Sequence, residues 1–205
     1  MNNLFGARSE NGRNNMAQRK AVGFIVVLVI IGVPLLTHAQ IDFGEDHQVP
    51  SNHVHEGDMY KIASRIIIDG QVNGELQALA ANSTVSGKVK GDLFYTGGQI
   101  NIPGTIGDSA RLLVGTLNLS GLIEGDLRAL AGMVVISDKA KVNGYLAIGT
   151  NNLLLDGTIN GNAWIRSGTT IISGTVQGDA NIQTDSLTLR PGARIMGDLI
   201  LRSRT

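Results

Sequence analysis

Apolar residues recur through most of the chain at a spacing of 17 residues. One such column keeps this spacing throughout, except for one interval of 19, and consists of Ile68, Val85, Ile102, Leu119, Ile136, Leu155, Ile172 and Leu189. A second column follows it in the same rhythm and consists of Val72, Val89, Ile106, Ile123, Val142, Ile159, Val176 and Ile195. Glycine falls between the two columns in most copies. Repetition at a fixed period is the signature of a solenoid.

Within each copy, apolar and intervening residues alternate, as in Ile66-x-Ile68 and Leu76-x-Ala78. A period of two is typical of β-strands, and glycine or Gly-Asp pairs mark the turns between them. One copy cannot bury its apolar face alone, so each must pair with the next. The sequence therefore predicts an all-β fold, a single-stranded parallel β-helix of about eight three-sided coils over residues 57–205. Ile, Val and Leu fill its interior.

Residues 1–39 have a different pattern. A polar, net positive start precedes the uncharged apolar run Ala21–Leu36, and the small residue Ala39 follows. This order is typical of a secretory signal peptide. The alternative is an uncleaved inner-membrane anchor through residues 21–39, because a helix of that length reaches ~28 Å. Both interpretations predict an exported protein, located in the periplasm, at the cell surface or outside the cell.

Residues 40–56 are acidic and contain histidines, and we expect them to form a linker and partial cap. His53 and His55 lie close to carboxylates, which is one way to bind zinc. The alternative, which we favour, is that His55 opens an incomplete first coil. A stacked column of carboxylates follows Gly in the later copies and consists of Glu75, Asp92, Asp126, Asp179 and Asp198. We expect these side chains to cap turns rather than to bind cations, so no metal or cofactor is predicted.

Composition narrows the function further. Lys and Arg number 17 and Asp and Glu number 17, and the basic excess lies in the first 39 residues, which argues against nucleic acid as a partner. Cysteine is absent, which excludes a thiol nucleophile. Histidine occurs four times, and the last is His55, so no Ser-His-Asp arrangement forms within the coils. We expect a non-enzymatic protein.

The phrase Gly-x-Val/Ile-x-Gly-Asp-Leu recurs in register at Gly87–Leu93 and Gly121–Leu127. It resembles the bactofilins, the polymer-forming cytoskeletal proteins of bacteria. The segment Leu187–Leu199 is similar to the last coil of exported relatives of that group, and the resemblance covers about residues 57–201. It implies a right-handed β-helix that polymerises end to end without a nucleotide and acts as a scaffold near membranes. Typical bactofilins are cytoplasmic, so the leader is a departure.

Two sets of apolar residues are candidates for self-association. Only a few residues follow Leu199 and Leu201, so we expect an open last coil that pairs with another copy by strand addition. Val135, Leu154 and Ile171 point outward on three successive coils by the same alternation, and an apolar ladder of this kind favours packing against a partner. The main hypothesis is an exported, self-associating scaffold whose first partner is itself, forming a homo-polymer.

The alternative hypothesis is an envelope or extracellular binding module that presents a rigid face to a polysaccharide or a protein. Four residues share one outward column and could present an aromatic and cationic stripe there. They are Phe94, Arg111, Arg128 and Trp164. Partners considered for such a face are cell-wall polysaccharide and the membrane.

Overall fold

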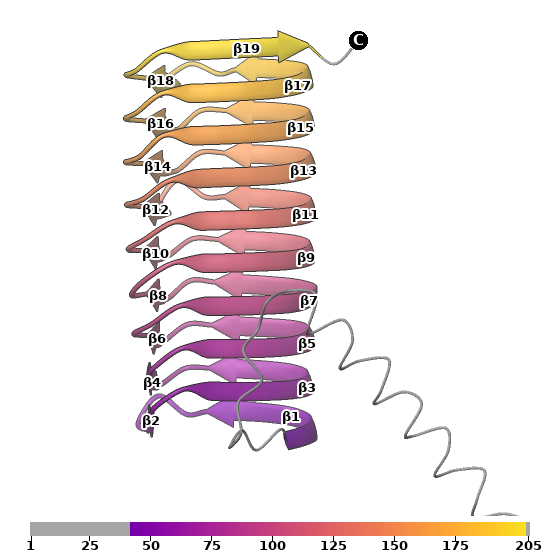
Figure 1. Ribbon diagram of the computed structural model, residues 1–205, viewed down its shortest axis with the longest axis vertical. Coiled ribbons are helices and arrows are strands. Elements are labelled where there is room, and N and C mark those ends of the chain that lie inside the picture. Colours follow the sequence, from indigo (N-terminus) through magenta and orange to yellow (C-terminus); the bar gives the residue numbers. More distant parts are fainter. Residues whose placement is uncertain (1–41, 204–205) are drawn as a thin grey trace, which may run out of the picture. The chain divides into compact units, whose positions relative to one another are not determined.

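A computed structural model describes residues 42–203. The predicted signal peptide or anchor, residues 1–39, lies outside the described residues. No helix among residues 42–203 is long and apolar enough to cross a membrane. The described chain is a rod of stacked turns made of strands alone (Figure 1).

Two sets of strands alternate along the chain. The odd-numbered strands are long, and they are β1 Asp42–Val49, β3 Met59–Ile68, β5 Leu76–Val85, β7 Leu93–Ile102, β9 Ala110–Leu119, β11 Leu127–Ile136, β13 Leu146–Leu155, β15 Ala163–Ile172, β17 Ala180–Leu189 and β19 Leu199–Ser203. The even-numbered strands are short, and they are β2 Val54–Glu56, β4 Gln71–Asn73, β6 Lys88–Val89, β8 Thr105–Ile106, β10 Leu122–Ile123, β12 Lys141–Val142, β14 Thr158–Ile159, β16 Thr175–Val176 and β18 Arg194–Ile195.

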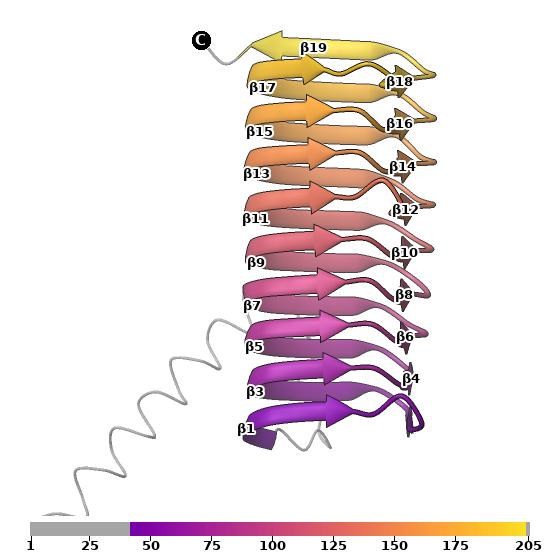
Figure 2. The ribbon, with the colours of Figure 1, turned by 180° about the vertical axis from the view of Figure 1, so that it is seen from behind.

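Each strand pairs in parallel with its equivalents one turn before and one turn after. The odd strands form a ten-stranded sheet and the even strands a nine-stranded sheet, both in the order of the chain (Figure 2). Leu127 lies opposite Ala110 on one side and opposite Leu146 on the other. The register follows the repeat found in the sequence, so the predicted parallel β-helix is confirmed.

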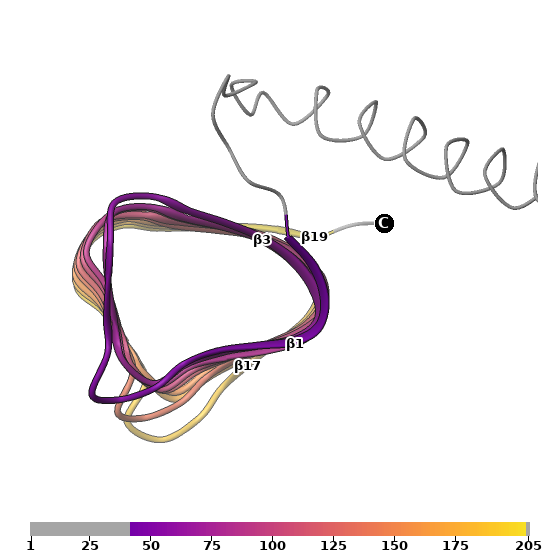
Figure 3. The same ribbon diagram turned by 90° about the horizontal axis from the view of Figure 1, so that it is seen from below.

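Each turn has three sides, as expected (Figure 3). The long strands bend near the middle, where the register passes from Ala131 to Met133 and leaves Gly132 unpaired with its equivalents. The first half of a long strand forms one side, the second half forms another, and the short strand forms the third. The glycines between the two apolar columns lie at another corner, where successive turns stack closely. A Cβ on Gly121 would lie 1.9 Å from the carbonyl oxygen of Gly104, so this position requires glycine.

The two apolar columns fill the interior. Ile68, Ile102, Leu119, Ile123 and Leu155 are 0 % exposed. Burying each such side chain stabilises the fold by about 1.5–3 kcal/mol before the entropic cost of ordering the chain. The core cluster consists of residues between Val49 and Ile195, so the solenoid is a folding unit with a core of its own.

The structure corrects two predictions about the start of the solenoid. It has about nine turns of about 17 residues rather than eight, and it begins at Asp42 rather than at residue 57. β1 pairs with β3 and β2 pairs with β4, so residues 42–56 form the first turn instead of a linker and partial cap. The columns did not reveal β1 because His47 stands in register with Ile66 and because Val49, in register with Ile68, is 19 rather than 17 residues away from it.

Candidate functional site

The last turn leaves one edge of each sheet open. β19 pairs with β17, and β18 pairs with β16, but no described strand pairs with the opposite side of either one. Their free N–H and C=O groups therefore point along the solenoid axis. Unpaired strand edges of this kind are templates for pairing with another chain.

The same turn exposes side chains at inward positions of the repeat. Leu189, Leu199 and Leu201 are 50 %, 42 % and 53 % exposed. Their equivalents one turn earlier are Ile172, Ala180 and Ile182, which are at most 1 % exposed. The side chains are apolar in both turns, and they differ only in whether a further turn covers them. Leu199 and Leu201, predicted from the sequence as association residues, thus lie together on an apolar end surface with Leu189, which was not predicted.

The first turn has a different chemistry in the same columns. His47 and His55 occupy inward positions and are half-buried, and the carbonyl oxygen of Asp58 lies 3.4 Å from His55 Nε2. Lys61 takes an inward position in the second turn, opposite Asp42 in the register. Polar side chains at these inward positions can contact water at an end of the solenoid at little energetic cost. The exposed leucines of the last turn cannot.

The predicted outward ladder is in register. Val135 lies beside Leu154, and Leu154 beside Ile171, on the side formed by the second half of the long strands. Each is half-buried, because the neighbours in the column cover part of its surface. The apolar area that this ladder offers is therefore smaller than the sequence suggested.

The predicted aromatic and cationic column lies on the side formed by the first half of the long strands. Phe94, Arg111 and Arg128 are consecutive, and Ala147 separates Arg128 from Trp164. The Arg111 guanidinium stacks 4.9 Å from the Phe94 ring centroid. Carboxylates hold two of the arginines, since Arg111 Nη1 lies 2.7 Å from Asp92 Oδ2 and Arg128 Nη2 lies 3.0 Å from Asp126 Oδ2.

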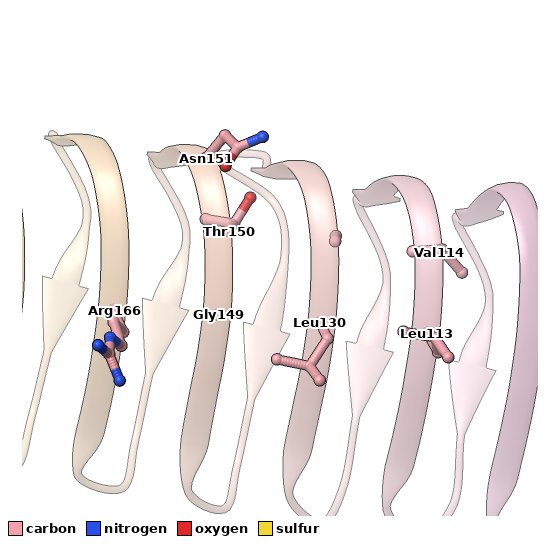
Figure 4. A pocket seen from close by; sticks show the side chains of 8 residues that line it. Leu113, Val114, Leu130, Gly149, Thr150, Asn151 and Arg166 are labelled. Atoms are coloured by element: carbon pink, nitrogen blue, oxygen red, sulfur yellow. The ribbon is translucent and has the colours of Figure 1, made fainter.

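The adjacent outward column contains residues that sequence reasoning missed. Leu113, Leu130, Gly149 and Arg166 line a shallow hollow of about 430 Å³ together with the corner residues Thr150 and Asn151 (Figure 4). Leu113 and Leu130 are 48 % and 61 % exposed. The signal was present in the sequence, because these residues follow the predicted column by two positions and so face the same way.

The carboxylate column has the structural role expected of it. Asp92 Oδ1 accepts a hydrogen bond from the Ser109 N–H at 2.9 Å, and Asp126 Oδ1 accepts one from the Tyr145 N–H at 2.9 Å. Each aspartate thus caps the corner of the following turn. Among residues 42–203, no group of three or more potential ligand side chains is placed to hold a metal ion.

These observations define a class of protein, a parallel β-solenoid whose last described turn exposes apolar side chains. Residues 101–200 match the bactofilin family model, described as polymer-forming cytoskeletal. The match confirms the resemblance to the bactofilins that the repeated phrase predicted. No curated protein and no solved structure matches the chain.

Proposed function

We propose that this protein is a non-enzymatic, exported scaffold that self-associates end to end through the last turn of its solenoid. One observation carries the proposal: three leucines of the core columns, Leu189, Leu199 and Leu201, are about half exposed at the end of the described rod. The bactofilin match, with its polymer-forming description, supports the same function.

The last turn offers two complementary sources of affinity. The free edge of β19 can accept a strand from another copy, which satisfies backbone groups without new side-chain chemistry. Covering the exposed half of each of the three leucines contributes about 1 kcal/mol. Both contributions act on the same edge, so the approaching turn must lie coaxially. Repetition of such contacts at both ends of the rod yields a filament.

The proposal of export rests on residues 1–39, whose basic, apolar and small-residue regions are typical of a secretory signal peptide. The periplasm, the cell surface and the medium are the compartments it favours, with an anchor through residues 21–39 as the alternative. Intact-mass analysis of the exported protein distinguishes the two: a chain that begins at Gln40 has lost a signal peptide. A right-handed coil is part of the proposal, and the path of the strands in Figure 1 supports it.

A second candidate function is a binding module that presents a rigid face to a polysaccharide or a protein partner. The hollow lined by Leu113, Leu130 and Arg166 favours it. The two functions use different surfaces, one at the end of the rod and one on its side, so substitutions separate them.

The test of self-association compares variants of one strand. Leu199→Arg and Leu201→Arg place a charge on the end surface, whereas Ile200→Arg places it on the outward side of β19, where Ile200 is 49 % exposed. In chains that begin at Gln40, we expect electron microscopy and light scattering to show filaments for the unmodified protein and for Ile200→Arg, and loss of assembly for the other two. An unmodified protein that stays monomeric at tens of micromolar contradicts the proposal.

A further inference from the structure

Strand β13 interrupts the row of large side chains on the arginine-bearing side of the solenoid. Its outward residues there are Ala147 and Gly149, whereas the flanking strands carry Arg128 and Leu130 on β11 and Trp164 and Arg166 on β15. The result is a slot one strand wide that runs along β13. Neighbouring strands are about 4.8 Å apart, so its walls are about 9.6 Å apart at the backbone.

The hollow of about 430 Å³ overlaps this slot at Gly149 and Arg166 and extends across β11 to Leu113 on β9. Figure 4 shows the Leu130 side chain extending toward the strand that carries Gly149. A Cβ on Gly149 would lie 2.5 Å from Leu130 Cδ2, so the missing side chain leaves the space into which Leu130 leans. Leu130 thus covers the Gly149 end of the slot with an apolar surface. Trp164 lies beside Ala147 in the register, and it is 40 % exposed.

The two outward columns of this side carry positive charge only, although Asp92 at their edge pairs with Arg111. From β3 to β19, the second and fourth residues of the long strands point outward, and they include Arg111, Arg128, Arg166 and Arg202 but no aspartate or glutamate. Asp126, at the edge of the slot, pairs with Arg128. Arg166 is exposed and has no ion-pair partner among the described residues. A ligand with carboxylates complements this charge, because a guanidinium binds a carboxylate through two parallel hydrogen bonds.

The backbone of β13 is closed to ligands. Its residues pair with β11 on one side and β15 on the other, so no strand can be added in the slot. An extended peptide lying on Ala147 and Gly149 would find no partners there for its own N–H and C=O groups. Recognition must come from side chains, namely the Trp164 ring face, the Arg166 guanidinium and the exposed Asn151 amide.

We propose that this slot binds a linear acidic polysaccharide, with sugar rings against Trp164 and uronic-acid carboxylates on Arg166. Aromatic rings with a polar edge suit ligands that have one apolar and one hydrated side, and a sugar ring is such a ligand. The inference rests on the second candidate function and is independent of self-association, since none of the slot residues lies in the last turn.

The experiment titrates chains that begin at Gln40 with oligogalacturonate and follows the heat of binding, while light scattering records assembly in the same samples. We expect Trp164→Ala and Arg166→Gln each to weaken binding about tenfold, a change equivalent to one lost charge-assisted or stacking contact. Ala147→Gln, which fills the slot without changing charge, is expected to weaken binding about tenfold as well. Lys88→Gln removes a positive charge from an exposed position on the third side and should change affinity less than about twofold.

Retained assembly with lost binding in the slot variants supports the proposal and separates it from a failure of the scaffold. Equal weakening by Arg166→Gln and Lys88→Gln would overturn it in favour of unspecific attraction. Polyglutamate that binds as tightly as oligogalacturonate would overturn it in favour of an acidic protein partner. The absence of any binding to oligogalacturonate by the unmodified protein would also overturn it.

Discussion

The first and last described turns are built from the same columns and differ in the chemistry of two inward positions, while Val49 keeps a third position of the first turn apolar. The first turn places His47 and His55 where later turns have Ile66 and Val72, whereas the last turn keeps apolar residues and leaves Leu189 and Leu201 half exposed. A repeat protein needs special residues wherever stacking stops. The first described turn has such residues and the last described turn does not, so we assign the apolar part of the end-to-end contact to the last turn.

Residues of the same type in one column have different roles in the middle of the solenoid and at its end. Leu155 and Leu189 belong to one column, and they are 0 % and 50 % exposed. Their difference depends only on whether another turn covers them. Equivalent positions in a solenoid therefore contribute to stability in the middle and to association at the end.

The largest expected effect is on stability, from matched alanine substitutions in that column. Leu155→Ala removes a fully buried side chain and should lower the free energy of unfolding by about 2–5 kcal/mol. Leu189→Ala should lower it by about 0.5 kcal/mol, because the side chain already meets water. Urea unfolding in the Leu201→Arg background measures both without interference from assembly. Equal losses would contradict the difference between the inner turns and the end.

A smaller effect is expected in the carboxylate column. Asp126→Ala removes the acceptor of the Tyr145 N–H, which should cost about 1 kcal/mol. The side chain of Asp198 in the last turn accepts no hydrogen bond from a described residue, so Asp198→Ala should change stability by less than about 0.5 kcal/mol. The same unfolding experiment compares them. A larger loss for Asp198→Ala would show that its carboxylate has a partner in another copy.

The smallest effect is expected at the first turn. His55→Val restores the residue found at Val72 and makes this end more apolar. We expect a modest rise in the mean size of the assemblies, about twofold at fixed protein concentration, which for linear end-to-end assembly corresponds to about 0.8 kcal/mol per contact. Light scattering measures this change, and Val54→Thr, at an exposed position of the same strand, is the control. A fall in size for His55→Val alone would mean that His55 itself takes part in association.

The sequence predicted the repeat, the parallel pairing and the inward columns because a period of two within a period of 17 leaves one way to bury the apolar residues. It placed His55 in an incomplete first coil, as the structure has it, but did not reveal β1, where His47 stands in register with Ile66. The capping role of Asp92 and Asp126 was predicted from aspartate after glycine, but the N–H groups that they accept from lie one turn later rather than in their own turn.

The hollow was harder to predict than the columns beside it. It depends on Gly149 standing between large neighbours from other turns, which becomes visible only when the outward residues are aligned across strands. Exposure at the last turn is likewise a property of what covers a residue. Leu199 was predicted to be open at the end of the chain, but Leu189, ten residues earlier, was not.

The most direct test of the central claim is hydrogen–deuterium exchange of the chain that begins at Gln40, measured dilute and after assembly. Association through the last turn predicts that the amides of Arg194–Ile195 and Leu199–Ser203, whose strands have a free edge, become protected, while Ala147–Gly149 on the side of the rod keep their exchange rates. Protection that spreads over the outward sides and leaves β19 unchanged would contradict the account.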